Sequence, residues 1–214
     1  MANSPISPRL IKGGLVLIDP ATSAVRRIII LQYNPDSLSR ALSPQTAGEG
    51  AALRYKGPPV ETIQVEAEVD AADRMDQPER AGGPAGLTVL PILSAIEEIL
   101  YPASSQLVDN QRLAEQGVLS ILPLEAPLVL FVWSKNRIIP VRLNSLSVVE
   151  EAFDTQLNPI RAKIHLEMRV LSVADLGFNH RGGTLYMVYQ QKKEELARQL
   201  ESGSFNMLGI GGLP

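Results

Sequence analysis

The chain has 214 residues, a formal net charge of −3, 45% hydrophobic residues, 20% charged residues and no cysteine. This composition excludes a disordered chain and is sufficient for a folded core. The small net charge gives no support to binding of nucleic acid or anionic lipid. The lack of cysteine excludes disulfides, thiolate metal sites and cysteine nucleophiles.

The N-terminus, MANSPISPRLIKGG, lacks the basic-then-apolar pattern of a secretory signal peptide. No apolar run approaches the ~20 residues needed to span a bilayer. We therefore expect synthesis and assembly in the cytoplasm and no direct membrane insertion. Residues 1–9 hold two prolines among small polar residues and are expected to form an N-terminal arm.

The first half of the chain predicts a strand hairpin followed by a long connection. Leu10–Asp19 and Val25–Tyr33 are rich in β-branched and apolar residues, and a turn-forming run separates them. Residues 36–59 show no clear period and are punctuated by glycine and proline. We expect them to be a long loop, which in a compact domain is usually functional or ordered by a partner.

The segment Glu61–Val69 alternates between apolar and polar residues, as a strand with one buried face does. Its polar face carries Thr62, Gln64, Glu66 and Glu68, and suits solvent, a subunit contact or a channel wall. The next segment, 70–87, is charged and rich in glycine and proline. It predicts a second long loop.

Two segments predict helices. Apolar residues recur at helical spacing in Pro91–Tyr101, where Thr88 is a candidate cap, and in Thr184–Glu201. Residues 103–126 are mixed and predict no regular element. Residues 202–214 form a Gly-rich apolar tail that cannot build a core of its own, so we expect it to be disordered or docked on a partner.

The apolar run Leu128–Trp133 predicts a buried strand that turns into a second strand over Ile138–Leu143. Pro140 interrupts this second strand. Because proline cannot donate a hydrogen bond to a neighbouring strand, Pro140 predicts a strand at an edge or at a bulge.

The clearest periodic signal lies between Asn144 and Val173, which we interpret as a large hairpin with a wide turn at DTQLNP. In its second half, apolar and polar residues alternate over eleven positions. The predicted dry face comprises Ile160, Ala162, Ile164, Leu166, Met168 and Val170, and the wet face comprises Arg161, Lys163, His165, Glu167 and Arg169.

Together these elements predict a mainly β protein of six to eight strands with two peripheral helices. Because hairpins join most of the strands, we expect an antiparallel barrel or two-sheet sandwich. Residues 10–201 would form this single domain, with the long loops 36–59 and 70–87.

The sequence contains no recognisable catalytic constellation. It has no Gly-rich phosphate loop after a strand, and its two histidines, His165 and His180, lack assignable partner ligands or nucleophiles. Glu150 and Glu151 are adjacent in a predicted strand and point to opposite faces. We predict no enzyme activity, cofactor or metal.

Five runs taken together resemble a known family. They are LQYNPDSLSR at 31–40, KGPPVETIQVEAEVDAAD at 56–73, ILSAIEEILYP at 92–102, the segment 127–172, which contains EEAFDTQLNPIRAKIHLEMRVL, and the C-terminal helix. Their order and spacing are similar to the tube-type domain of contractile injection systems, which are phage-tail-like particles. The resemblance is to the branch that joins the central spike to the inner tube.

The resemblance implies a fold of the phage tail-tube type and a homohexameric ring, with long hairpins lining a central channel. The implied partners are the central spike protein, the inner tube protein and neighbouring baseplate subunits, in an extracellular or membrane-anchored particle. Members of this branch often continue into a peptidoglycan-binding LysM-type domain. This chain stops at Pro214, so a cell-wall role is not expected.

On this interpretation six polar residues form inter-subunit pairs or line the channel: Glu61, Gln64, Glu66, Arg161, Lys163 and Arg169. Two alternatives remain. The chain is an ordinary inner-tube subunit repeated along the particle, or it is a monomeric β-barrel that binds a small apolar ligand.

Overall fold

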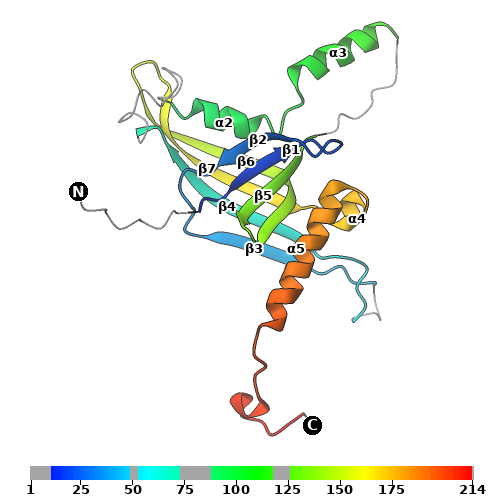
Figure 1. The fold of residues 1–214 in the computed structure, drawn as a ribbon. Helices are drawn as coiled ribbons and strands as arrows, with labels where there is room; N and C mark the ends of the chain where they lie inside the picture. Colours follow the sequence, from blue (N-terminus) through cyan, green and yellow to red (C-terminus); the bar gives the residue numbers. More distant parts are fainter. Residues whose placement is uncertain (1–10, 49–52, 73–87, 118–125, 214) are drawn as a thin grey trace, which may run out of the picture.

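The computed structural model describes residues 11–48, 53–72, 88–117 and 126–213. They form one seven-stranded antiparallel sheet, with the strand order β2-β1-β5-β6-β7-β4-β3, and helices at its periphery (Figure 1). The prediction of a mainly β protein is confirmed. The sheet is open at β2 and β3 and is not a closed barrel. The described residues hold four α-helices, where the sequence predicted two.

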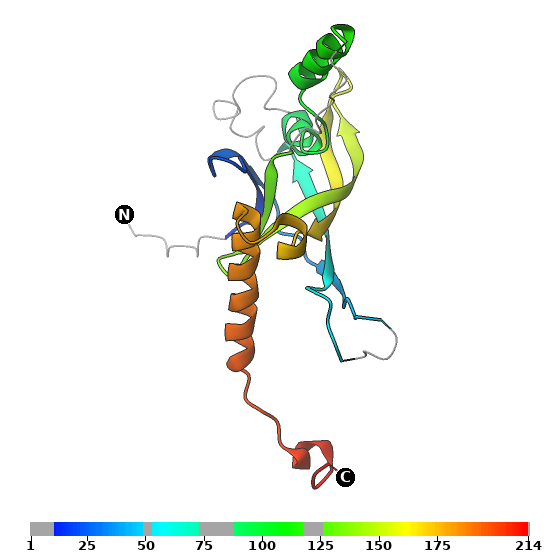
Figure 2. The ribbon, with the colours of Figure 1, turned by 90° about the vertical axis from the view of Figure 1, so that its right-hand side faces the viewer.

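The strands are β1 (Gly14–Ile18), β2 (Val25–Ile30), β3 (Leu38–Ser43), β4 (Val60–Asp70), β5 (Leu128–Ser134), β6 (Arg137–Phe153) and β7 (Pro159–Val170). The helices are α2 (Leu90–Glu97), α3 (Ser104–Glu115), α4 (Val173–Leu176), α5 (Arg181–Arg198) and a 3-10 turn, η3 (Phe205–Leu208). In Figure 2, α5 leaves the sheet as a straight rod and the tail continues away from the body.

The larger of two apolar clusters among the described residues packs against the inner face of the sheet. It receives side chains from six strands, β1, β2 and β4–β7, together with Leu93 and Ile96 of α2 and Tyr186 and Tyr189 of α5. Each large apolar side chain buried here stabilises the fold by about 1.5–3 kcal/mol. The Gln32 amide, beyond the end of β2, bonds the backbone N–H and C=O of Asp70 at 2.9 and 2.7 Å. This side chain links the β2 side of the sheet to the end of β4.

The long hairpin predicted between Asn144 and Val173 is formed by β6 and β7. β6 spans 17 residues and β7 spans 12. The register shifts at Asn144, where one extra residue forms a bulge. The bulge changes which positions face the core, from Val141 and Leu143 before it to Leu146 and Val148 after it. The predicted strand 138–143 and the first half of the hairpin are therefore one continuous strand.

Pro140 lies in a central strand, so the expectation of an edge position is wrong. In an antiparallel sheet, the backbone nitrogen and carbonyl oxygen of one residue point to the same neighbouring strand. The Pro140 carbonyl accepts a hydrogen bond from Leu171 N at 2.9 Å, beyond the last residue of β7. The nitrogen of Pro140, which has no hydrogen to donate, therefore faces the point where the β6–β7 pairing ends. No hydrogen bond between the two strands is lost.

Two further predictions need correction. The predicted loop 36–59 contains β3, a short edge strand whose weak alternation follows from the exposure of most of its residues. The segment 103–126, for which no regular element was predicted, contains α3, which has no buried residue. Such a helix lacks the apolar stripe from which helices are predicted. The predicted arm at 1–9 and residues 73–87 of the second predicted loop lie outside the described residues.

Candidate functional site

The outer face of the sheet carries a ladder of charged residues on β4, β7 and β6. The basic residues of the central strand β7 stand opposite acidic residues of its neighbours. Glu68 pairs in register with Lys163, Glu66 with His165, and Glu151 of β6 with Arg161. Opposite charges that face each other across strands stabilise the register.

Most basic residues of the ladder are paired within the chain. Arg161 contacts Asp70 at 2.7 Å, Lys163 contacts Glu151 at 3.0 Å, and Nδ1 of His165 lies 3.6 Å from Glu66. The hydrogen bond and charge of Glu151 raise the pKa of Lys163. These side chains are solvent-accessible, so each pair contributes only ~0–1 kcal/mol. The ladder therefore offers a polar surface and contributes little to stability.

A groove of about 580 Å³ opens on this face, between the ladder and the segment that connects β2 to β3. Its walls are residues 33–37 on one side and Glu66, Glu68, Lys163 and His165 on the other. The lining mixes carboxylates, a lysine and an imidazole. Such a lining suits polar contacts with another macromolecule better than it suits an apolar ligand.

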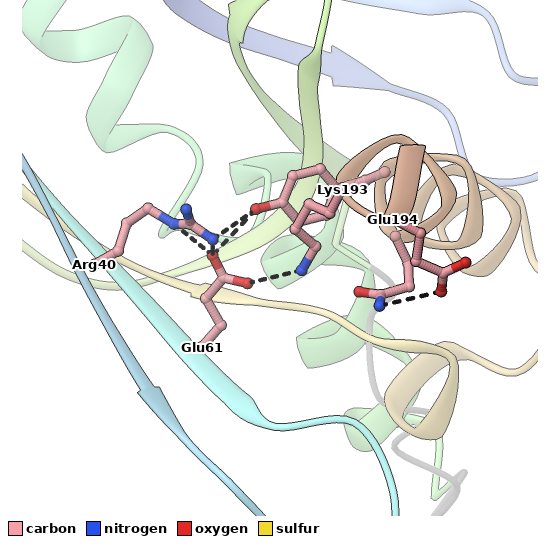
Figure 3. A network of polar contacts seen from close by, with 6 residues as sticks. Arg40, Glu61, Lys193 and Glu194 are labelled. Atoms are coloured by element: carbon pink, nitrogen blue, oxygen red, sulfur yellow. Dashed lines mark hydrogen bonds and ion pairs between the residues drawn. The ribbon is translucent and has the colours of Figure 1, made fainter. Parts of the chain in front are cut away.

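A second charged group is buried on the inner side of the same sheet. Glu61 of β4 is 2% exposed and accepts hydrogen bonds from Arg40 of β3, at 2.8 and 2.5 Å. Tyr189 of α5 donates to the same carboxylate at 3.3 Å, and Lys193 lies 3.9 Å from its other oxygen. Figure 3 shows Arg40 and Lys193 converging on Glu61. We call these four residues the Glu61 cluster.

The Glu61 cluster fixes α5 to the β3–β4 edge of the sheet. Burial and the nearby Glu61 charge raise the pKa of Tyr189 to about 12. Burial lowers the pKa of Lys193, although Glu61 partly opposes this effect, and Lys193 Nζ also lies 4.4 Å from the centre of the Tyr189 ring. A buried charge that keeps its partners is tolerated, whereas removal of one partner is strongly destabilising.

The tip of the β6–β7 hairpin presents apolar side chains on a structured turn. Asp154 accepts backbone bonds from Gln156 and Asn158, both at 2.8 Å, and a side-chain bond from Asn158. Leu157 has φ 64° and is 80% exposed, and Phe153 is also exposed. A leucine in left-handed backbone is strained by ~1–2 kcal/mol, and such strain tends to occur at functional positions.

The loop with the second histidine has a structural role in the described fold. His180 is the N-cap of α5, and its Nδ1 accepts a hydrogen bond from Gly182 N at 3.1 Å. A side chain at Gly183 would meet the carbonyl oxygen of Gly177 at 1.9 Å, so only glycine fits this junction. Ser172 and Asp175 form a capping box for α4, which the spacing Ser-x-x-Asp could have indicated.

The structure places the predicted residues in two groups. Gln64, Glu66, Arg161 and Lys163 lie on the outer ladder, and Arg169 pairs with Asp175 of α4 at 2.7 Å. Glu61 differs from them because it is buried inside the chain, away from any surface that a partner would contact. Of the predicted dry face of β7, all members are buried except Ile160, which is half-buried.

Sequence reasoning missed the partners of these charges: Arg40, Tyr189, Lys193, Asp70, Glu151 and Asp175. One signal was present in the sequence. Glu61, Ile63 and Val65 are two positions apart along β4. Side chains at this spacing share one face of a strand, so the sequence already indicates that Glu61 lies on the dry face. Its partners come from β3 and α5, which are distant in sequence, and no local pattern identifies them.

Comparisons with known proteins do not assign the chain to a family: no protein-family model matches it, and no curated protein matches it significantly. Within the described ranges, no group of three or more histidine, aspartate or glutamate side chains is arranged to hold a metal ion. No helix in those ranges combines the length and the apolar character needed to cross a membrane.

Proposed function

We propose that this chain is a structural subunit of a contractile injection system that forms a hexameric ring between the central spike and the inner tube. Its partners on this proposal are further copies of itself, the spike protein, the tube protein and neighbouring baseplate subunits. Its role is mechanical: the sheet forms a rigid wall, and loops and hairpin tips contact the adjoining layers.

The observation that carries the proposal is that, among the described strands, β2 and β3 end the sheet without a second strand partner. β2 and β3 each have a single strand neighbour. In β2 five of six residues are exposed, among them Val25, Ile28 and Ile30, and in β3 four of six are exposed. Unpaired edge strands, above all ones with exposed apolar residues such as those of β2, favour uncontrolled pairing unless a partner covers them. Joining the β2 edge of one copy to the β3 edge of the next would cover both edges and, with a suitable rotation, close a ring.

The long hairpin and its polar outer face also support this function. Such a face suits the wall of a water-filled channel, since its charges are paired within the subunit. The hairpin tip exposes Phe153 and Leu157, and on this proposal these apolar side chains contact an adjoining layer. Assembly energy would come mainly from strand addition and apolar burial, because exposed ion pairs contribute little.

The alternatives make different predictions. A repeated inner-tube subunit has the same ring geometry and differs in copy number. A small-ligand barrel predicts a monomer with a saturable apolar pocket. The open sheet and the charged residues that line the 580 Å³ groove do not favour that class.

Native mass spectrometry over a range of protein concentrations tests ring formation. We expect a hexamer for the wild-type chain and a monomer for Ile28→Lys, because a lysine on the edge strand opposes strand addition. Val188→Lys is the matched control, since Val188 is similarly exposed but lies on α5. A wild-type chain that is monomeric at every concentration, or equal effects of the two variants, would contradict the proposal.

A further inference from the structure

The C-terminal tail presents apolar side chains that have no core around them. Residues 202–213 contain no charged residue. Backbone bonds from Gly209 N to Asn206 O and from Ile210 N to Phe205 O hold the η3 turn in shape. Met207 is 83% exposed, and Phe205, Leu208 and Ile210 are exposed as well. The tail is therefore a preformed apolar peptide.

An apolar groove lies near the opposite end of α5. It has a volume of about 200 Å³ and runs between the chain after α2, the start of β5 and helix α4. Leu100, Pro127, Leu171 and Leu176 contribute to its walls, and Arg142 and His180 are its charged and titratable lining residues. This volume is below the ~300–1,000 Å³ of small-molecule sites. It suits one or two anchoring side chains of a peptide.

The geometry separates the tail from the groove of its own chain. The groove borders His180 at the start of α5, and α5 has 18 residues, a length of about 27 Å. Figures 1 and 2 both show the tail continuing away from the body beyond the far end of this helix. The same chain could fill its groove only if the linker after α5 reversed and ran back fully extended along the helix.

We propose that the tail of one copy, centred on Phe205, Met207 and Leu208, docks in this groove of a second copy. The two surfaces match in chemistry, because an uncharged apolar peptide meets an apolar cleft. The contact is head-to-tail, because the tail of each copy binds the groove of the next copy. Successive copies can therefore be joined. The inference requires a second copy of this chain and does not require the spike or the tube.

Cross-linking of single-cysteine variants tests the contact directly, because the chain has no native cysteine. Leu208→Cys, carrying a size tag, is mixed with untagged Leu100→Cys and treated with a short bis-maleimide. We expect a tagged–untagged product at least tenfold more abundant than with the control Ser94→Cys, an exposed position on α2 outside the groove. Phe205→Asp should weaken self-association, measured by sedimentation, at least tenfold.

Three results would overturn the inference. The first is equal cross-linking with the groove and control variants, and the second is no intermolecular product. The third is cross-linking only within a single chain that carries both Leu100→Cys and Leu208→Cys, which would show that the tail occupies its own groove. A hexamer that persists without the specific product would refute the tail contact alone and leave the proposed ring intact.

Discussion

Glu61 and Glu66 are the same residue type, five positions apart on β4, and they have opposite energetic roles. Glu61 is buried and held by Arg40, Tyr189 and Lys193, whereas the Glu66 side chain is 84% exposed and lies 3.6 Å from His165. Residues of opposite parity in a strand face opposite sides of the sheet. The inner charge holds α5 to the sheet, and the outer charge belongs to a surface available for contacts.

The difference shows that the sign and number of charges do not decide their function. The environment decides it, because a carboxylate removed from water needs its partners and a solvated carboxylate does not. The β3–β4 edge is thus stabilised from within the subunit. In the proposed ring, the outer ladder and the free edges of β2 and β3 would remain available to partners.

The largest expected effect comes from a charge placed on the dry face of β7. Ile164 is 1% exposed, and Ile164→Asp would bury a carboxylate without a partner. We expect a loss of several kcal/mol, a large part of the ~5–15 kcal/mol that stabilises a typical domain. Soluble yield and circular dichroism measure it. Full folding of this variant would show that the two faces of β7 are wrongly assigned.

Glu61→Gln should cost about 3 kcal/mol in free energy of unfolding, because Arg40 and Lys193 would lose their shared counter-ion. The matched control is Glu66→Gln, the same change on the same strand, with an expected cost below about 1 kcal/mol. Urea denaturation of both variants measures the difference. Equal costs would refute the contrast between the buried cluster and the exposed ladder.

Alkaline pH should weaken the Glu61 cluster through Tyr189. Its pKa is raised to about 12 from 10.0. A raised pKa means that the folded state favours the protonated phenol, so this contribution is complete below pH 10 and is lost as the pH rises toward 12. The two-unit shift corresponds to about 3 kcal/mol.

The measurement is the free energy of unfolding of the wild type minus that of Tyr189→Phe, at several pH values up to 12. Subtraction removes the titration of groups common to both proteins. We expect the difference to fall above pH 10. A difference that is constant or rises with pH would contradict the burial of the phenol beside Glu61.

The smallest expected effect on stability belongs to the ladder. Lys163→Asp would break the pair with Glu151, yet its cost should be ~1 kcal/mol or less because the side chains are exposed. The subunit should fold, and any change should appear in ring contacts or channel charge. A stability loss as large as that of Ile164→Asp, judged by the same assays, would show that this face is buried.

Much of the fold was predictable because it follows local periodicity. The alternation in Glu61–Val69 and 160–170 indicated β4 and β7, and the turn DTQLNP indicated the hairpin that joins β6 to β7. β3 and α3 were not predictable in this way, because elements with little or no buried surface lack an apolar stripe. A proline is tolerated at position 140 of a central strand because β7 ends opposite it. That depends on the tertiary fold and cannot be predicted from the local sequence.

For the charged residues of the candidate site, the sequence predicted which face of the sheet each one lies on, but not which residues it pairs with. The period of β7 indicated that Arg161 and Lys163 are exposed, but it could not indicate that Asp70 and Glu151 pair with them. The parity of Glu61 indicated a buried carboxylate, and Tyr189 reaches it from α5, a helix that packs against β6. Contacts between residues 128 positions apart are fixed by topology, and a single sequence does not display them.

The most direct test of the proposed ring is the copy number of this chain in an assembled particle, measured by quantitative mass spectrometry against the repeated sheath subunit. We predict about six copies per particle, the number for one closed ring at the spike–tube junction. A copy number equal to that of the sheath would make the chain the inner tube itself. The absence of the chain from any such particle would contradict the proposed function.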